Sequence, residues 1–181
     1  MRLDAVVADG EAALRLRSGR PQAPEPDAAT KRLALFCNNQ AWTLATGPAA
    51  DRDPARAVAL ARVAAGLAPD EAIYHNTLGI ALYRDVRHAE AVPVLERSLA
   101  AGRGESDAFD LFFLAMCRHR LGDAALARAD FDRAVGWLDA HPTLDARWLA
   151  ELKSFRAEAK AVLAGPPGEL PVELFAPAAA R

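Results

Sequence analysis

The sequence has little of the chemistry from which catalytic and metal sites are built. It contains two cysteines in 181 residues, and none of its four histidines is spaced with cysteine or acidic residues as a metal site requires. No glycine-rich phosphate loop follows a strand pattern, and no serine stands in the context of a nucleophile elbow. We therefore expect no metal, no cofactor and no enzymatic activity.

Long apolar runs and an excess of one charge are missing as well. The 22 lysines and arginines nearly balance the 24 acidic residues, so the net charge of −2 gives no reason to expect a nucleic acid or an anionic membrane as partner. No segment has the length of a membrane span, and residues 1–19 lack the uninterrupted apolar centre of a signal peptide. These features predict no nucleic-acid partner, no membrane contact and a cytoplasmic location.

Alanine is what the chain has in abundance. Hydrophobic residues make up 52% of the sequence although aromatic residues make up only 7%. Because alanine is the best helix former and β-branched runs are scarce, we expect an all-α protein. Proline and glycine residues break the expected helices. They divide the chain into an N-terminal segment with a short helix and a proline-rich linker (1–26), three helical pairs (27–69, 70–103 and 104–140), a further helix (141–165) and a flexible tail (166–181).

Acidic residues mark the expected starts of several helices. Asp27, Asp53 with Pro54 behind it, and Asp107 each precede an apolar periodic stretch, as N-cap residues do. The last long helix is expected from about Thr143 to Leu163. The connections are short, so successive helices should be antiparallel neighbours.

A spacing of small and apolar residues recurs about every 35 positions. Its copies are Ala57-x3-Ala61-x2-Ala64, Ala91-x3-Leu95-x2-Ser98 and Ala127-x3-Phe131-x2-Ala134, preceded by Gln40-Ala41, Leu78-Gly79 and Leu114-Ala115. Helical pairs repeated in this way cannot bury their apolar faces alone and must stack on their neighbours. We expect Gly79, facing Ala91, to allow a close approach of the two helices of its pair.

The middle copy reads His75-x2-Leu78-Gly79-x2-Leu82 followed by Ala91-x3-Leu95, and the first copy closes with Pro69. This pattern resembles the tetratricopeptide repeat over residues 30–140, and its first copy is similar to tetratricopeptide tracts of large bacterial serine/threonine kinases. No kinase motif is present. The resemblance implies an α-solenoid of three helical hairpins with a C-terminal capping helix. Two departures are Val86, where a turn glycine is common, and Arg103 in place of a closing proline.

In tetratricopeptide proteins the first helix of each pair lines a concave groove, so the resemblance supplies candidate binding residues. The positions expected to be exposed there are Leu35, Asn38, Trp42, Ile73, Asn76, Ile80, Arg84, Phe109, Phe112, Met116 and Arg120. Asparagine can donate to and accept from a peptide group at once, and aromatic residues anchor interfaces. Each type also has a purely structural interpretation: a hydrogen bond to a nearby turn, core packing, or stabilisation of a helix C-terminus by arginine.

The sequence favours a non-catalytic interaction module that binds a protein or peptide partner in the groove. The lysines of the family's carboxylate clamp are missing from the repeats, which argues against a receptor for chaperone tails. Self-association, or a scaffold element of a signalling assembly, is a variant of this hypothesis. An enzyme on a helical scaffold is the rival, but no acid–base cluster falls on the expected inner face.

Overall fold

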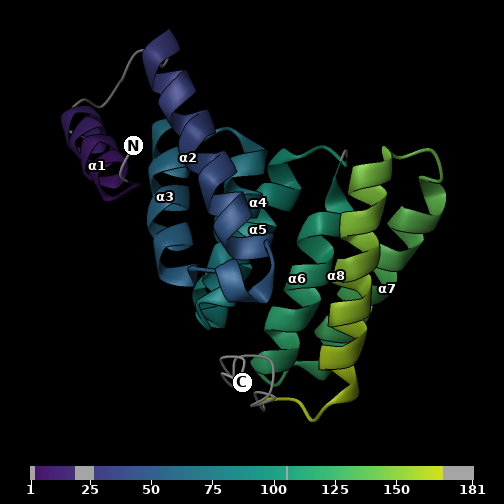
Figure 1. Cartoon of the computed structure of the whole chain (residues 1–181). Helices are drawn as coiled ribbons and strands as arrows, with labels where there is room; N and C mark the ends of the chain where they lie inside the picture. The colour runs from purple at the N-terminus through teal and green to yellow at the C-terminus, as the bar shows by residue number, and fades with distance from the viewer. Residues whose placement is uncertain (1–2, 19–26, 105, 169–181) are drawn as a thin grey trace.

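A computed structural model of the chain describes residues 3–18, 27–104 and 106–168 (Figure 1). The described part is all-helical and contains no strand, as the composition predicts. The expected linker and most of the expected tail lie outside the described residues. The helices are α1 (Leu3–Ser18), α2 (Ala28–Thr46), α3 (Pro54–Leu67), α4 (Ala72–Arg84), α5 (His88–Ala101), α6 (Asp107–Arg120), α7 (Ala124–Ala140) and α8 (Ala146–Ala164), with a 3₁₀ turn η1 (Ala49–Asp51) after α2.

Short-range signals set most helix starts. Asp27, Asp53 and Asp123 each accept a hydrogen bond from the backbone N–H three residues on, at 2.7, 3.1 and 3.1 Å. The expected cap at Asp107 is wrong: α6 begins one residue earlier in register, with Ser106 at the N-cap position and Asp107 inside the first turn. The last helix starts later than expected, because Asp145 is its N-cap and accepts from the N–H of Arg147 at 2.8 Å.

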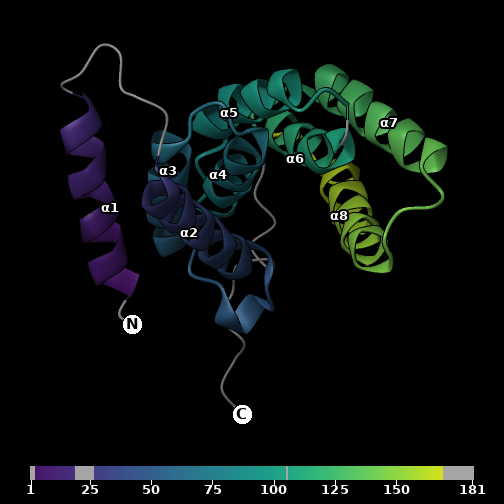
Figure 2. The same ribbon diagram turned by 90° about the horizontal axis from the view of Figure 1, so that it is seen from above.

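The helices pack in the order in which they follow one another. The closest pairs are α2 with α3, α4 with α5 and α6 with α7, and each pair also packs on the next. Seen from above, α3, α5 and α7 form one row and α2, α4 and α6 a second row (Figure 2). The core lies between the rows, so α4 and α6 are buried on almost every side.

The close approach at Gly79 is present, but its neighbour differs from the expected one. A Cβ atom added at Gly79 would lie 2.4 Å from the side chain of Leu95 on α5, so Leu95 and not Ala91 fills the space above the glycine. The two unusual turns are strained at the positions that the sequence marks. Val86 has φ 63° and Arg103 has φ 54°, in the left-handed region where a side chain is unfavourable.

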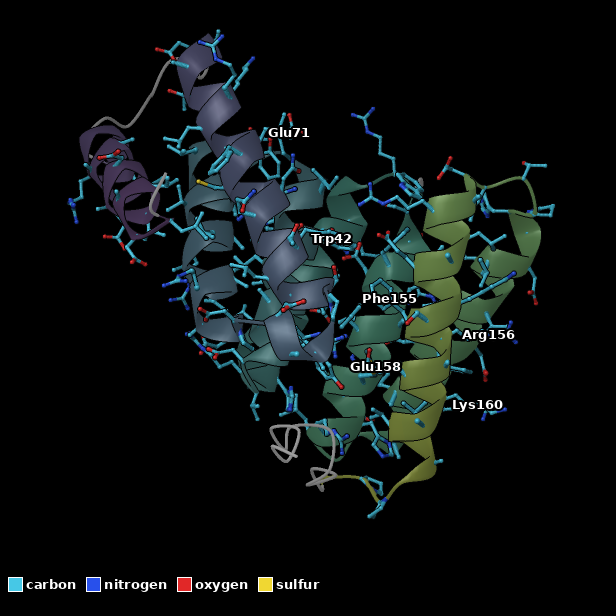
Figure 3. All side chains as sticks on the ribbon, in the orientation of Figure 1. Trp42, Glu71, Phe155, Arg156, Glu158 and Lys160 are labelled. Carbon is cyan, nitrogen blue, oxygen red and sulfur yellow. The ribbon has the colours of Figure 1, made fainter. Side chains whose placement is uncertain are left out.

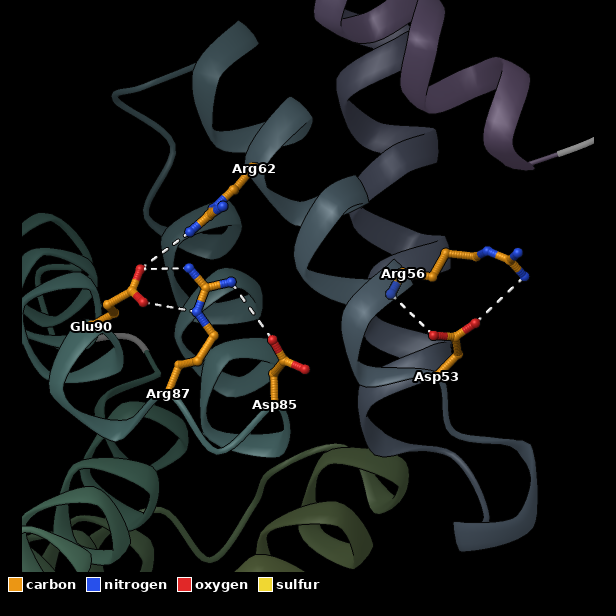
Figure 4. A network of polar contacts seen from close by, with 6 residues as sticks. All are labelled: Asp53, Arg56, Arg62, Asp85, Arg87 and Glu90. Carbon is orange, nitrogen blue, oxygen red and sulfur yellow. Dashed lines mark hydrogen bonds and ion pairs between the residues drawn. The ribbon is translucent and has the colours of Figure 1, made fainter.

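Charged side chains link the outer row of helices. Figure 4 shows Glu90 between Arg62 of α3 and Arg87, with Arg87 also reaching Asp85. The side chains of Arg62 and Glu90 are half-exposed and those of Arg87 and Asp85 about one third exposed, so the network contributes less to stability than the core does. Cys37 and Cys117 are buried free thiols, and burial raises the pKa of Cys37 to about 11. None of the described helices is long and apolar enough to span a bilayer.

Candidate functional site

Helix α8 lies beside α6 at the end of the inner row and defines the candidate site. It packs mainly against α6 and only lightly against α7, its neighbour in sequence. Both ribbon views place α8 beside α6 (Figures 1 and 2). A single apolar stripe of α8 is buried, formed by Leu152, Phe155, Ala159 and Val162.

The ring of Phe155 fills the space between α2 and α6. Its centroid lies 6.2 Å from that of Trp42 on α2, and 6.1 and 5.0 Å from those of Phe109 and Phe113 on α6. Figure 3 shows Trp42 and Phe155 facing each other across the gap between α2 and α8. Edge-on aromatic contacts of this kind add to the stabilisation that area burial supplies. The chain's own helix therefore covers part of the inner surface.

Arg84 of α4 is held by α8 and α2. Both terminal nitrogens of its guanidinium donate to the carboxylate of Glu158, the Nη2 to Oε2 bond measuring 2.7 Å. Its Nε donates to the carbonyl of Ala45 in the last turn of α2 at 3.2 Å. Arg84 is only 5% exposed. The arginine thus stabilises a helix C-terminus, as one interpretation of the sequence expects, but the helix is α2, and its charge is balanced within the chain.

Several other positions expected to be exposed are buried. Ile80, Phe112 and Met116 have no exposed surface, and Arg120 is buried at the end of α6. The expectation is wrong for them because α4 and α6 are covered on the inner side as well as on the outer side. Phe112, for example, packs its ring against Phe131 of α7. The core-packing interpretation therefore holds for these apolar residues.

All the other predicted residues except Leu35 meet at an open pocket of about 620 Å³ at one end of the inner row. Five of them contribute to its lining: Asn38, Trp42, Ile73, Asn76 and Phe109. The expected exposure is wrong for Asn38, Asn76 and Phe109, which are buried beneath the pocket surface. The pocket is formed by α2, the start of α4, the turn before α6 and the start of α8, where Trp148 and Glu151 line it. Ile73 and Trp148 are 57% and 43% exposed. Leu35, at 51%, is exposed on α2 outside the lining.

The sequence does not predict that residues of α8 line the pocket. Trp148 belongs to an apolar stripe that can be recognised, but nothing in the sequence says that this stripe meets α6. Once α8 lies there, the ring of Trp148 packs against Phe109 at 5.6 Å. Asp70, Glu71 and Arg103 also line the pocket, because the turns before α4 and α6 open onto it. Charges of both signs surround the opening, and Arg147 pairs with Glu151 at 3.5 Å.

Asn76 is fixed by a buried network under the pocket. Its Nδ2 donates to Oδ1 of Asp110 at 2.9 Å, and the Oγ of Ser98 lies 3.0 Å from Oδ2 of Asp110 and 3.0 Å from the carbonyl of Ala72. Because the carboxyl needs the amide NH₂ as a donor, the carbonyl oxygen of Asn76 is the atom not used by Asp110. Asn76 therefore links α4 to α6, which is a structural role, and it also belongs to the pocket lining.

Burial raises the pKa of Asp110 to about 7 despite the hydrogen bonds from Asn76 and Ser98. The geometry suits the protonated carboxyl. Its Oδ2–H can donate to Ser98 Oγ, whose own proton then goes to the carbonyl of Ala72, so that each polar atom has a partner. Ionisation removes one of these two donors. Asn38 is also buried, at 4% exposure, and its Oδ1 has no hydrogen-bond partner within the described part of the chain.

Within residues 3–18, 27–104 and 106–168, no three histidine, cysteine or acidic side chains come together as a metal site. The pocket offers amide groups, aromatic walls and a rim with charges of both signs. The scan against protein-family models found no match, and the searches of curated proteins and of solved structures found none either.

Proposed function

We propose that the chain is a tetratricopeptide-like, non-catalytic interaction module that binds a segment of a partner protein at the open pocket of its inner face. The spacing of small residues and the stepwise packing of α2 to α7 support the repeat assignment. The proposal includes a cytoplasmic location, which the sequence favours.

One observation carries the proposal. The pocket brings together residues of α2, α4, α6 and α8, and it leaves Ile73 and Trp148 exposed at its edge. Large apolar side chains beside amide groups are typical of interfaces that bind peptides: the apolar groups supply affinity and the amides fix the backbone.

The proposal is tested by selecting binders from a displayed library of random peptides on the immobilised full chain. Ile73→Glu places a charge at the pocket edge and leaves the core untouched, because Ile73 is 57% exposed. Leu121→Glu is the matched control, since Leu121 is 50% exposed and lies outside the pocket lining. We expect Ile73→Glu to weaken the selected peptides about thirtyfold, as loss of an interface hot spot does.

Leu121→Glu should leave their affinity unchanged. Selected peptides that bind wild type and Ile73→Glu equally well would place the binding surface elsewhere. A library that yields no binder would count against the module itself.

A further inference from the structure

Helix α8 contacts the inner row in the manner of a bound ligand. It reaches three helices that precede it through two side chains on one face: Phe155 between α2 and α6, and Glu158 on Arg84 of α4. The next helix in the chain, α7, holds it only lightly. The segment between them, residues 141–145, is a short non-helical connection. The position of α8 thus depends on the groove more than on its neighbour in sequence.

The opposite face of α8 is charged and exposed to solvent. Lys153, Arg156 and Lys160 are exposed there, and Figure 3 shows Arg156 and Lys160 on the side of α8 that faces away from Trp42. A helix with one narrow apolar stripe and a charged outer face is the usual form of a helix that binds in a groove of another protein. The segment has this form within its own chain.

The residues of the inner face determine which side chains a helix that covers them must carry. Arg84 lies beside the ring of Phe113, at 5.3 Å, and is almost fully buried beneath α8. A buried guanidinium without a carboxylate is strongly unfavourable, so any helix that covers Arg84 has to bring an acid. The space lined by Trp42, Phe109 and Phe113 calls for an aromatic ring one helical turn earlier.

We propose that α8 occupies, within the chain, the site of a partner's helix, and that this partner segment is an amphipathic helix with an aromatic residue followed three positions later by a glutamate. This inference rests on the proposed function and names the partner class for the same inner face. The open pocket, with Trp148 of α8 as one wall, is the place where such a segment makes its first contact before it replaces α8.

A synthetic peptide of residues 146–164, labelled with fluorescein, is the probe, and fluorescence anisotropy with the full chain is the measurement. The helix in the chain competes with the peptide, so weakening it should strengthen binding in trans. We expect the Phe155→Ala/Glu158→Gln chain to bind the wild-type peptide at least about tenfold more tightly than the wild-type chain does. Arg156→Ala, on the exposed face of the same helix, is the matched control and should change nothing.

Two further variants keep the test decisive if the double variant folds poorly. Glu158→Gln alone preserves the shape of α8. An insertion of ten glycine and serine residues after Thr143 leaves all contacts of α8 intact but lowers its effective concentration at the groove, which should strengthen trans binding about fivefold. Arg84→Met, added to any of these chains, should abolish the preference for the wild-type peptide over a peptide carrying Glu158→Gln.

If none of the weakened chains binds the peptide more tightly than wild type, α8 is a fixed part of the core and the inference is overturned. The same holds if Arg84→Met leaves the peptide preference unchanged. Library peptides that still depend on Ile73 would then preserve the proposed function without this partner class. Library peptides that ignore Ile73, together with trans binding of the α8 peptide, would instead overturn the pocket and leave the groove assignment standing.

Discussion

Asp110→Asn should change how the stability of the protein depends on pH. Burial raises the pKa of Asp110 to about 7 in the folded state, whereas its ordinary value is 3.8. Below the lower value the carboxyl is protonated in both states. As the pH rises from the lower to the higher value, only the unfolded chain loses the proton, so the free energy of unfolding falls. One pKa unit is worth about 1.4 kcal/mol, so the wild type should lose about 3 kcal/mol from this group between pH 5 and 8.

Asparagine at this position imitates the protonated carboxyl. Its carbonyl can accept from Asn76 and its amide can donate to Ser98, so the network under the pocket stays complete. We therefore expect the variant to equal or exceed the wild type at pH 8, with an advantage about 3 kcal/mol larger than at pH 5. Every other titrating group is present in both chains, so its contribution cancels in the difference between their free energies of unfolding.

Urea denaturation followed by far-ultraviolet circular dichroism at pH 5, 6, 7 and 8 measures this difference. A difference between the two chains that stays constant across the series would refute the buried, proton-retaining Asp110. A variant that is less stable than wild type at all four values would show that the carboxylate itself is required.

Other perturbations follow from the packing and the burial. Gly79→Ala should destabilise the protein by about 1–3 kcal/mol in urea denaturation, because the new methyl group meets Leu95. Gly136→Ala, where a Cβ meets nothing within 4 Å, should be neutral or stabilising in the same measurement. In the Asp110→Asn chain, lowering the pH from 7 to 5 should cost about 2 kcal/mol, since burial lowers the pKa of His88 to about 4; His88→Leu should remove this slope. Deleting residues 143–181 uncovers the rings of Trp42, Phe109 and Phe113, so size-exclusion chromatography should show association or aggregation. An unchanged monomer with an unchanged melting temperature would contradict the covering role of α8.

The features that the sequence predicts well are those decided by nearby residues. The caps at Asp27 and Asp53 depend on a side chain and an N–H three positions apart, and the helix breaks depend on proline and glycine. The cap at Asp107 fails because Ser106 takes the N-cap position, two residues after the pair of Arg103 and Gly104 with their positive φ angles. The spacing between a capping residue and its helix can be read from a sequence. The backbone conformation of the turn before the helix cannot.

The candidate site is predictable only in part for a different reason. Asn38, Trp42, Ile73, Asn76 and Phe109 all lie on the first helix of a helical pair, so a periodic pattern finds them. Whether such a position stays open depends on what lies over it. The pairing of Arg84 with Glu158 joins residues 74 positions apart, and no local sequence pattern predicts it. For this reason the sequence leaves Arg84 and the apolar positions of α6 as exposed candidates.

The order of the helices also affects how the chain acquires its structure. Contacts among α2 to α7 join neighbours in sequence, and chains with such local contacts fold within microseconds to milliseconds. Helix α8 packs mainly on α6, so it can dock only after α6 has folded. During synthesis, moreover, α8 leaves the ribosome after every helix that forms the groove. A nascent chain therefore exposes the α8-facing side of α6 for a time, and the partner helix that we propose would find this surface open before α8 competes.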